Sequence, residues 1–386
     1  MNTLQLNKKG VNGRTLNVVG LDGRSVSFPL RTPDSEPISP YIKFADPEVK
    51  RICVENWGSD GEITYEQAAA VTNLNNQFRG NSIITSFDEL KWFTGLSFLN
   101  SYEFYQATAL KSISLPDSII EIKDGDLNGG GCFSKCTSLE EVQMSKNISK
   151  IGICAFFTDT ALAKCDLPPT ITYIGQSAFA VTSLTGDINL PNLFSIQNFV
   201  FQRTQIGNIE SLGNITSIPD GNADTGEGVF SRCDNMISVN IPDTLINIGR
   251  AAFWNSGLQT LNTKNVQSIR RNAFAFNDLR YAILGSFTTT IEIVSFRGNP
   301  LETLICLSLI PPSLALRAFE ETPIASGTGS IYVPDGTTTD ADGNTITIVE
   351  AYKAATNWST YAARIFPISQ LQTDNPELYA EIEEYL

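Results

Sequence analysis

Ten phenylalanines recur along this chain at nearly fixed intervals, and their spacing restricts the chain to one kind of architecture. Successive members lie 21 to 23 residues apart, except for two gaps of 29. Each long gap carries a Gly-rich insertion, DGDLNGGG at 124–131 and DGNADTGEG at 220–228. A fixed period with insertions at one point of the unit predicts a solenoid, in which each unit buries its apolar face against its neighbours. The ten are Phe104, Phe133, Phe156, Phe179, Phe201, Phe230, Phe253, Phe274, Phe296 and Phe319.

The residues around each phenylalanine define the unit. An Ile or Leu usually precedes it by five residues, as Ile174 precedes Phe179, and another apolar residue follows it by five or six. A short alternating stretch such as Val142-x-Met144 comes next, and alternation of this kind predicts a strand with every second side chain inside. A Pro such as Pro191 often ends the strand, because Pro has no N–H to donate. The unit reads L-x-x-I-x-L-P-x-x-I-x-x-I-G-x-x-A-F.

This unit resembles the BspA-like leucine-rich repeat family, which is found on bacterial surface proteins. IGICAFFTDTAL, IGQSAFAVTSL and IGRAAFWNSGL are the clearest copies. The resemblance covers 42–369 and implies a leucine-rich repeat solenoid of about nine to ten β-containing turns, with a helical N-terminal cap and an α/β C-terminal cap. It also implies a surface that binds protein or carbohydrate, although a scaffold alone names no ligand.

Five segments are expected along the chain. Residues 1–40 hold a β-hairpin, LNVVG and VSFPL around an Asp-Gly turn, and a Pro-rich linker. The hairpin either docks the solenoid onto a larger assembly through 1–35 or packs on its own cap. The other segments are a helical cap at 41–100, the solenoid at 101–325, a closing segment at 326–369 and an acidic C-terminal helix at 370–386.

The caps carry their own signals. Helices are predicted at 42–56 and 64–78, with Thr64 as an N-cap, and another helix is predicted to begin at Asp374-Asn375-Pro376, since Pro suits the first helical turn. The tail beyond it either folds back or joins a homo-oligomer. An apolar plug around Leu90 and Phe93 should shield the first turn, and residues including Tyr352 and Trp358 should cover the last.

Composition excludes several functions. The net charge of −14 argues against nucleic acid, whose binding depends on Lys and Arg. No apolar stretch is long enough to span a membrane, and the first twenty residues lack the apolar core of a secretory signal. The chain has no histidine, so His-based nucleophile activation is excluded. Loop carboxylates such as Asp224 and Glu227 leave a glycoside hydrolase as a distant alternative. We therefore expect no enzyme, no catalytic residues and no cofactor.

Two features could suggest metal or disulfide chemistry. The seven cysteines are expected to be buried thiols, two of which, Cys136 and Cys233, lie three residues after a repeat phenylalanine. The segment NWGSDGEITYEQ at 56–67 has the outline of a calcium loop, with Asn56, Asp60 and Glu62 as weak candidate ligands. Its third position is Gly58 and its twelfth is Gln67, so a loop without metal is favoured over a degenerate calcium site.

The candidate binding surface is the outward face of the repeat strands. Residues on either side of each central apolar position should form two columns, and strands about 4.8 Å apart make a ladder of roughly 40 Å. The surface turns apolar at Tyr281 and Ile283, a possible hot spot. The candidate residues are Glu141, Gln143, Lys164, Asp166, Asp187, Asn189, Asn208, Glu210, Ser238, Asn240, Thr260, Asn262, Tyr281 and Ile283.

Three functions fit these features. The first is a non-catalytic adhesion protein, extracellular or on a cell surface, that recognises protein or glycan through its strand face. The second is a tail component of a phage or injection particle, located on a virion, that binds a bacterial surface and needs no export signal. The third is an intracellular structural or assembly protein.

Overall fold

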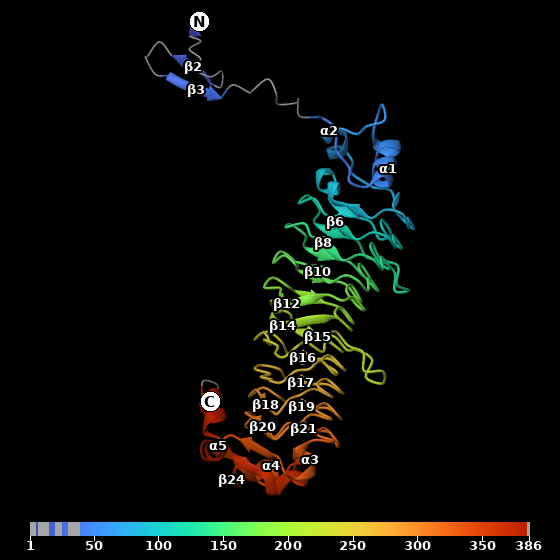
Figure 1. Ribbon diagram of the computed structural model, residues 1–386. Coiled ribbons are helices and arrows are strands. Elements are labelled where there is room, and N and C mark those ends of the chain that lie inside the picture. Colours follow the sequence, from blue (N-terminus) through green and yellow to red (C-terminus); the bar gives the residue numbers. More distant parts are fainter. Residues whose placement is uncertain (1–4, 7–14, 20–24, 30–38, 384–386) are drawn as a thin grey trace.

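The computed structural model describes residues 5–6, 15–19, 25–29 and 39–383. Residues 39–383 form an elongated stack of about 11 turns between two caps (Figure 1). The leucine-rich repeat solenoid predicted from the phenylalanine spacing is thereby confirmed. Before it, β2 (Thr15–Val19) pairs antiparallel with β3 (Ser25–Pro29), as the hairpin prediction requires. The sequence did not predict the third strand, β1 (Gln5–Leu6), and the turn and linker at 20–24 and 30–38 lie outside the described residues.

Each turn contributes a strand to two parallel faces. We call the first the strand face, because it carries the alternating segments of the repeats. It contains β4 (Ser86–Phe87), β6 (Ser112–Ser114), β8 (Glu141–Gln143), β10 (Lys164–Cys165), β12 (Thr185–Asn189), β14 (Gln205–Ser211), β18 (Tyr281–Leu284), β20 (Thr303–Cys306), β22 (Ser330–Val333) and β25 (Ile365–Pro367). Between β14 and β18, two turns have no named strand on this face; isolated parallel bridges pair Ile209 of β14 with Val239, and Asn262 with Ile283 of β18.

The second face consists of two-residue strands, each ending in the Ile or Leu that precedes the repeat phenylalanine. In register, Ile174 of β11 pairs with Ile151 of β9 and Ile196 of β13, so identical positions stack. The strands are β5 (Phe98–Leu99), β7 (Glu121–Ile122), β9 (Lys150–Ile151), β11 (Tyr173–Ile174), β13 (Ser195–Ile196), β15 (Ser217–Ile218), β16 (Asn247–Ile248), β17 (Ser268–Ile269), β19 (Thr290–Ile291) and β21 (Ser313–Leu314).

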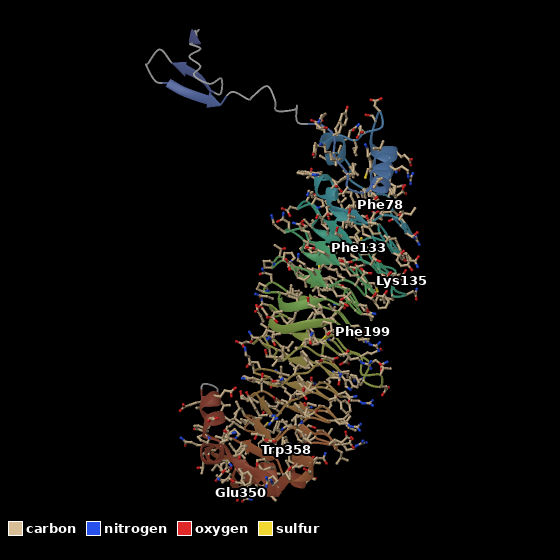
Figure 2. All side chains as sticks on the ribbon, viewed as in Figure 1. Phe78, Phe133, Lys135, Phe199, Glu350 and Trp358 are labelled. Atoms are coloured by element: carbon tan, nitrogen blue, oxygen red, sulfur yellow. The ribbon has the colours of Figure 1, made fainter. Side chains whose placement is uncertain are left out.

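The ten phenylalanines form one continuous stack inside the solenoid. All ten are fully buried, and successive ring centroids lie 5.0–5.8 Å apart with interplanar angles of 1–29°. Phe78 adds a ring that the sequence did not reveal, 5.2 Å from Phe104. At the other end, Trp358 lies 6.3 Å from Phe319, and Figure 2 shows Phe78 and Trp358 at opposite ends of the repeats.

The turn around each phenylalanine is a third hydrogen-bonded side of the solenoid. The residue two after each phenylalanine has positive φ, and in seven of the ten turns so does the residue two before it, for example Val181 (62°) and Ser177 (55°) around Phe179. Their N–H groups and that of Phe179 all donate to the next turn, at 2.9 to 3.0 Å. Left-handed backbone costs a non-Gly residue about 1–2 kcal/mol. These inter-turn hydrogen bonds offset that cost in unit after unit.

A buried polar ladder lies three residues after each phenylalanine. Asn277 and Asn299 donate from Nδ2 to the carbonyl of the preceding turn's phenylalanine, at 2.7 and 2.8 Å. The Cys136 and Cys233 thiols donate to the same carbonyl position, at 3.0 and 3.1 Å. Buried carbonyls need such partners, because an unpaired one is costly. The ladder consists of Cys136, Asp159, Thr182, Thr204, Cys233, Ser256, Asn277, Asn299 and Thr322, and the equivalent position after Phe104 is filled by the apolar Ala107 instead.

The N-terminal cap is less helical than the sequence predicts. α1 (Pro47–Trp57) begins at the N-cap Asp46, whose carboxylate accepts from Glu48 N and Val49 N. α2 (Tyr65–Ala69) has the expected N-cap Thr64 with a capping box, but the helix predicted to reach 78 ends at Ala69. The following residues, up to the 3-10 helix η1 (Asp88–Trp92), pack apolar side chains into the first turn instead. Leu90 and Phe93 are fully buried, as the plug prediction requires.

The C-terminal cap closes the other end with short elements. Tyr352 and Trp358 are fully buried over the last turn, and Trp358 Nε1 donates to Pro312 O at 2.7 Å. The acidic, Gly-bearing segment after β22 forms a hairpin, as predicted. The elements are α3 (Pro323–Ser326), β23 (Thr337–Thr339), β24 (Thr345–Thr347), α4 (Ile348–Ala354), η2 (Trp358–Arg364), α5 (Ile368–Asp374) and α6 (Pro376–Ile382).

Candidate functional site

The strand face presents the predicted two columns of polar side chains. In β8, Val142 is buried while Glu141 and Gln143 on either side of it are exposed. The same alternation recurs in later turns, because a strand side chain that does not enter the core must point away from it. Among the candidates, Glu141, Gln143, Lys164, Asp166, Asp187, Asn189, Glu210, Asn240 and Thr260 are exposed, and Asn208, Ser238, Asn262 and Tyr281 are half-buried.

A groove crosses the N-terminal half of this face, where the sheet is interrupted. β10 ends the sheet that begins at β4, and no ladder joins it to β12 within residues 39–383. Pro168 and Pro169 follow β10 and cannot donate, whereas β12 bulges after Gly186, which has a φ of 91°. A hollow of about 290 Å³ lies in this break, and an adjoining hollow of about 610 Å³ lies over β8, β10 and the residues that follow them. The two share Asp166 and Leu167 in their walls. We call them together the strand-face groove.

Six candidate residues line the strand-face groove and give it mixed charge. Lys164 forms an ion pair with Glu141, and Asp187 Oδ1 accepts a hydrogen bond from Asn208 N at 2.7 Å. Met144 and Leu167 add apolar surface to the walls. The six are Glu141, Gln143, Lys164, Asp166, Asp187 and Asn189. Exposed hydrogen-bonding groups around a partly apolar hollow are suited to reversible recognition.

The middle of the strand face uses its polar side chains internally. Asn208 Oδ1 accepts from Ser238 N at 3.0 Å, and Asn240 Nδ2 donates to Glu210 O at 3.1 Å. Lys264 Nζ in turn donates to Asn240 Oδ1 at 3.1 Å. A further hollow of about 450 Å³ begins there, with Asn262 in its wall. These side chains are positioned by the scaffold, so this part of the face is rigid.

The apolar end of the strand face is not available to a partner, contrary to the hot-spot prediction. Ile283 is only 3% exposed, because α5 and α6 fold back over this end of the face (Figure 1). Leu371 and Ile382 of these helices share one apolar cluster with it. Tyr281 Oη donates to Glu381 Oε1 at 2.6 Å. The helix predicted at Pro376 exists, and its function here is to cover the patch that the sequence suggested as a binding site.

The candidate calcium loop is a tight turn with other hydrogen-bond partners. Asn56 Nδ2 donates to Ile52 O at 2.8 Å, within its own helix. Glu62 forms an ion pair with Lys50 at 2.7 Å, and Asp60 has a φ of 52° in the turn. Asn56, Asp60 and Glu62 are therefore not brought together as ligands. In the part of the chain that the structure describes, no three acidic, Cys or His side chains form a possible metal site.

All seven cysteines are free and buried, as predicted. Burial raises the pKa of the Cys154 thiol to about 11 and that of Cys233 to about 12. A thiol whose pKa is raised in this way is a poor nucleophile, because only the thiolate attacks. Separately, no helix among the described residues has the length and apolarity to cross a membrane.

The stacked parallel strands and the repeated phenylalanine define a class, the leucine-rich repeat solenoid. The profile of the BspA type leucine rich repeat region matches residues 97–223 and 216–324, more than half of the chain. The chain therefore belongs to the BspA-type leucine-rich repeat family. Comparison with curated proteins gave no match.

Two solved structures are similar to this chain. One is a leucine-rich repeat protein from Bacteroides ovatus, 14% identical, with a TM-score of 0.32, covering 86% of this chain and 98% of its own. Another is a leucine rich cell surface protein from Faecalibacterium prausnitzii, 13% identical, with a TM-score of 0.27, covering 75% of this chain and 91% of its own.

Proposed function

We propose that this chain is a non-catalytic adhesion protein that binds a protein or glycan surface through the strand-face groove. The carrying observation is the pair of adjoining hollows over β8, β10 and β12, where six exposed polar side chains converge. The cell-surface protein of Faecalibacterium prausnitzii motivates an extracellular or cell-surface location for this chain too.

The groove supports binding rather than chemistry because of how its groups are held. Asp166 and Asp187 are exposed, so their charges stay solvated, and Lys164 is already paired with Glu141. Solvated carboxylates lack the desolvated surroundings by which active sites tune acids and bases. The rigid backbone of the stacked turns instead lowers the entropic cost of binding, since little has to be ordered on contact.

The proposal is tested by charge reversal in the groove. A protein and glycan array screened with the wild-type chain supplies a partner, and its affinity is then measured for Asp166→Lys, Asp187→Lys and the matched control Gln267→Lys. Gln267 is exposed and lies immediately before β17 of the second face. We expect the two groove variants to weaken binding at least about tenfold, or about 1.4 kcal/mol. Equal affinity of groove variants and control would remove the groove from the binding site.

A further inference from the structure

The two Gly-rich inserts are built on one plan. In each, a bridge closes the loop, between Asp126 and Gly130 in the first and between Asn222 and Glu227 in the second. Each loop then places a glycine of positive φ directly against the aromatic residue that follows the stacked phenylalanine of the succeeding turn, Phe156 or Phe253. A Cβ on Gly129 would lie 2.9 Å from the Phe157 ring, and one on Gly226 would lie 2.5 Å from the Trp254 ring. Both inserts therefore support an aromatic side chain on the same edge of the solenoid.

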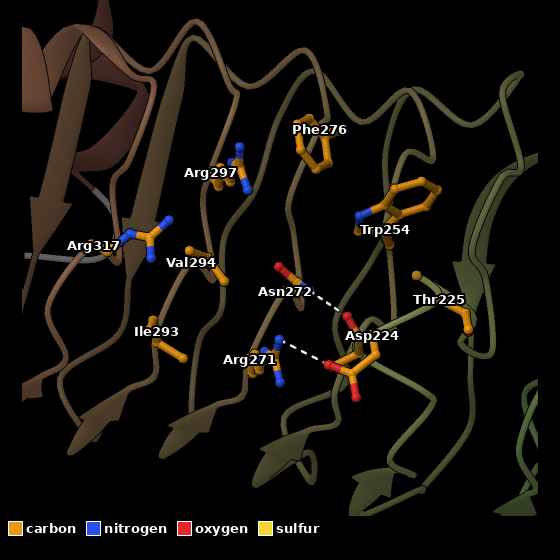
Figure 3. Close-up of a pocket in the computed structure, with 12 residues that line it drawn as sticks. Asp224, Thr225, Trp254, Arg271, Asn272, Phe276, Ile293, Val294, Arg297 and Arg317 are labelled. Atoms are coloured by element: carbon orange, nitrogen blue, oxygen red, sulfur yellow. Dashed lines mark hydrogen bonds and ion pairs between the residues drawn. The ribbon is translucent and has the colours of Figure 1, made fainter.

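The second insert has a basic pocket beside it. A hollow of about 450 Å³ lies between this insert and the four turns that follow (Figure 3). We call it the insert pocket. Its walls hold two aromatic rings, Trp254 and Phe276, at a centroid distance of 5.7 Å, and three arginines from successive turns, Arg271, Arg297 and Arg317.

Register within the repeats shows what distinguishes the two inserts. Ala251 N bonds to Arg271 O just as Cys154 N bonds to Gln176 O. Likewise Phe276 N bonds to Arg297 O as Val181 N bonds to Gln202 O. The first insert thus faces Gln176, Val181 and Gln202 where the second faces Arg271, Phe276 and Arg297. The scaffold does not require the basic and aromatic residues, since it accepts neutral ones in the equivalent place.

The insert pocket gathers basic side chains from three turns, and carboxylates beside it pair with them. Its lining carries three guanidinium groups and a single carboxylate, Asp224, in a chain of net charge −14. Asp224 is bound to Arg271 at 2.9 Å, and Asn272 Nδ2 donates to Ala223 O at 2.7 Å, so both contacts hold the insert in place. Arg297 is paired with Glu320 and Glu321, and Arg317 is paired with Glu320. Each guanidinium has five N–H donors, so Arg271 and Arg297 keep donors beyond these ion pairs.

Backbone recognition is excluded along this edge. The N–H groups of Ala251, Phe253 and Phe276 donate to the next turn and cannot meet a ligand. Peptide recognition commonly relies on main-chain hydrogen bonds of this kind. A ligand must instead be recognised by side chains, namely guanidinium groups and the apolar surfaces of Trp254, Phe276 and Ile293. Phe276 and Ile293 are 36% and 37% exposed, so apolar contact area is available.

We propose that the insert pocket binds an acidic sugar residue of a glycan. A sugar carboxylate would accept charge-assisted hydrogen bonds from Arg271 and Arg297, whose planar forks suit that geometry. The apolar C–H face of the ring would lie on Phe276 and Ile293, and hydroxyl groups would reach Asn272 and Thr225. The site is separate from the strand-face groove and does not depend on the function proposed for it.

The test uses a trimer of galacturonic acid as the probe and its methyl ester as the neutral match. Binding is followed by calorimetry and by the fluorescence change of Trp254. We expect the acid to bind and the ester to bind at least about tenfold more weakly. The triple variant Arg271→Gln, Phe276→Val, Arg297→Gln introduces the residue types that face the first insert. We expect its affinity for the acid to fall by a similar factor.

Two controls separate this proposal from its alternatives. Arg297→Lys keeps the charge but not the fork, and should weaken binding even if the triple variant fails to fold. Asp187→Lys in the strand-face groove should leave the affinity for the galacturonic acid trimer unchanged, whether or not the groove has the proposed adhesion function. Any one of three results would overturn the proposal. The acid and the ester could bind with equal affinity, or none of the galacturonate, glucuronate and sulfated trimers could bind. An oligoglutamate of the same charge could also bind with the affinity of the acid.

Discussion

Asp159 occupies a position in the buried polar ladder that its neighbours fill with neutral groups. It is fully buried, and burial raises the pKa of its carboxyl well above the ordinary value. Oδ1 accepts from Cys136 N at 2.8 Å, but Oδ2 is buried with no partner. At the equivalent place in a later turn, Asn277 Nδ2 donates to Phe253 O and Phe274 O, at 2.7 and 2.9 Å. Asp159→Asn should therefore supply the donor that this position needs.

The expected gain follows from the groups involved. Relieving a buried acceptor without a partner contributes about 1–3 kcal/mol, and a new buried hydrogen bond contributes about 0.5–1.5 kcal/mol. We expect Asp159→Asn to raise the free energy of unfolding by about 2–4 kcal/mol at pH 7. This value is large against ordinary substitutions, most of which destabilise by about 1 kcal/mol.

The pH dependence gives the sharper measurement. The pKa of Asp159 is higher in the folded chain than in the unfolded chain, so its burial lowers the free energy of unfolding as the pH rises. This loss is absent below the pKa of the unfolded state and grows as the pH rises toward the pKa of the folded state. Acidification from pH 7 toward 4 should therefore narrow the difference between wild type and variant, by up to about 1.4 kcal/mol for each pH unit. Urea unfolding followed by circular dichroism at several pH values measures this, with the exposed Asp166→Asn as control. A variant that is less stable than wild type, or a difference independent of pH, would refute the reasoning.

Three further predictions follow from the same structure. Phe179→Ala should lower the free energy of unfolding by about 3–5 kcal/mol, because a fully buried ring leaves a cavity between two others; a loss under about 1 kcal/mol in urea unfolding would contradict continuous stacking. The native chain should resist thiol reagents at neutral pH and expose all seven thiols in denaturant; rapid native labelling of any cysteine would contradict their burial. Truncation after Asp374 removes α6 and should expose the apolar surface around Ile283, seen as new binding of a hydrophobic dye; unchanged dye binding would show that α6 does not cover it.

The candidate site shows where reasoning from sequence stops. Alternation in the strands identified which side chains leave the core, and the exposure of Glu141, Gln143, Asp187 and their counterparts confirms it. Alternation does not tell whether another segment covers an outward residue, and for this reason Ile283 was assigned wrongly. The interruption after β10 has a sequence signal, the pair Pro168-Pro169, but a groove also requires the neighbouring strand to bulge.

The sequence alone determined the solenoid, its period and its core, because a large aromatic residue every 22 or so positions can be buried only by stacking on its equivalents. It also located the two Gly-rich inserts, through the longer spacing of the phenylalanines, and the helix at Pro376, through capping chemistry. Tertiary structure alone decided which surfaces stay open, since that depends on contacts between residues far apart in the chain. Glu381 meets Tyr281 one hundred positions away, and Arg271, Phe276 and Arg297 line one pocket because successive turns stack beside one another.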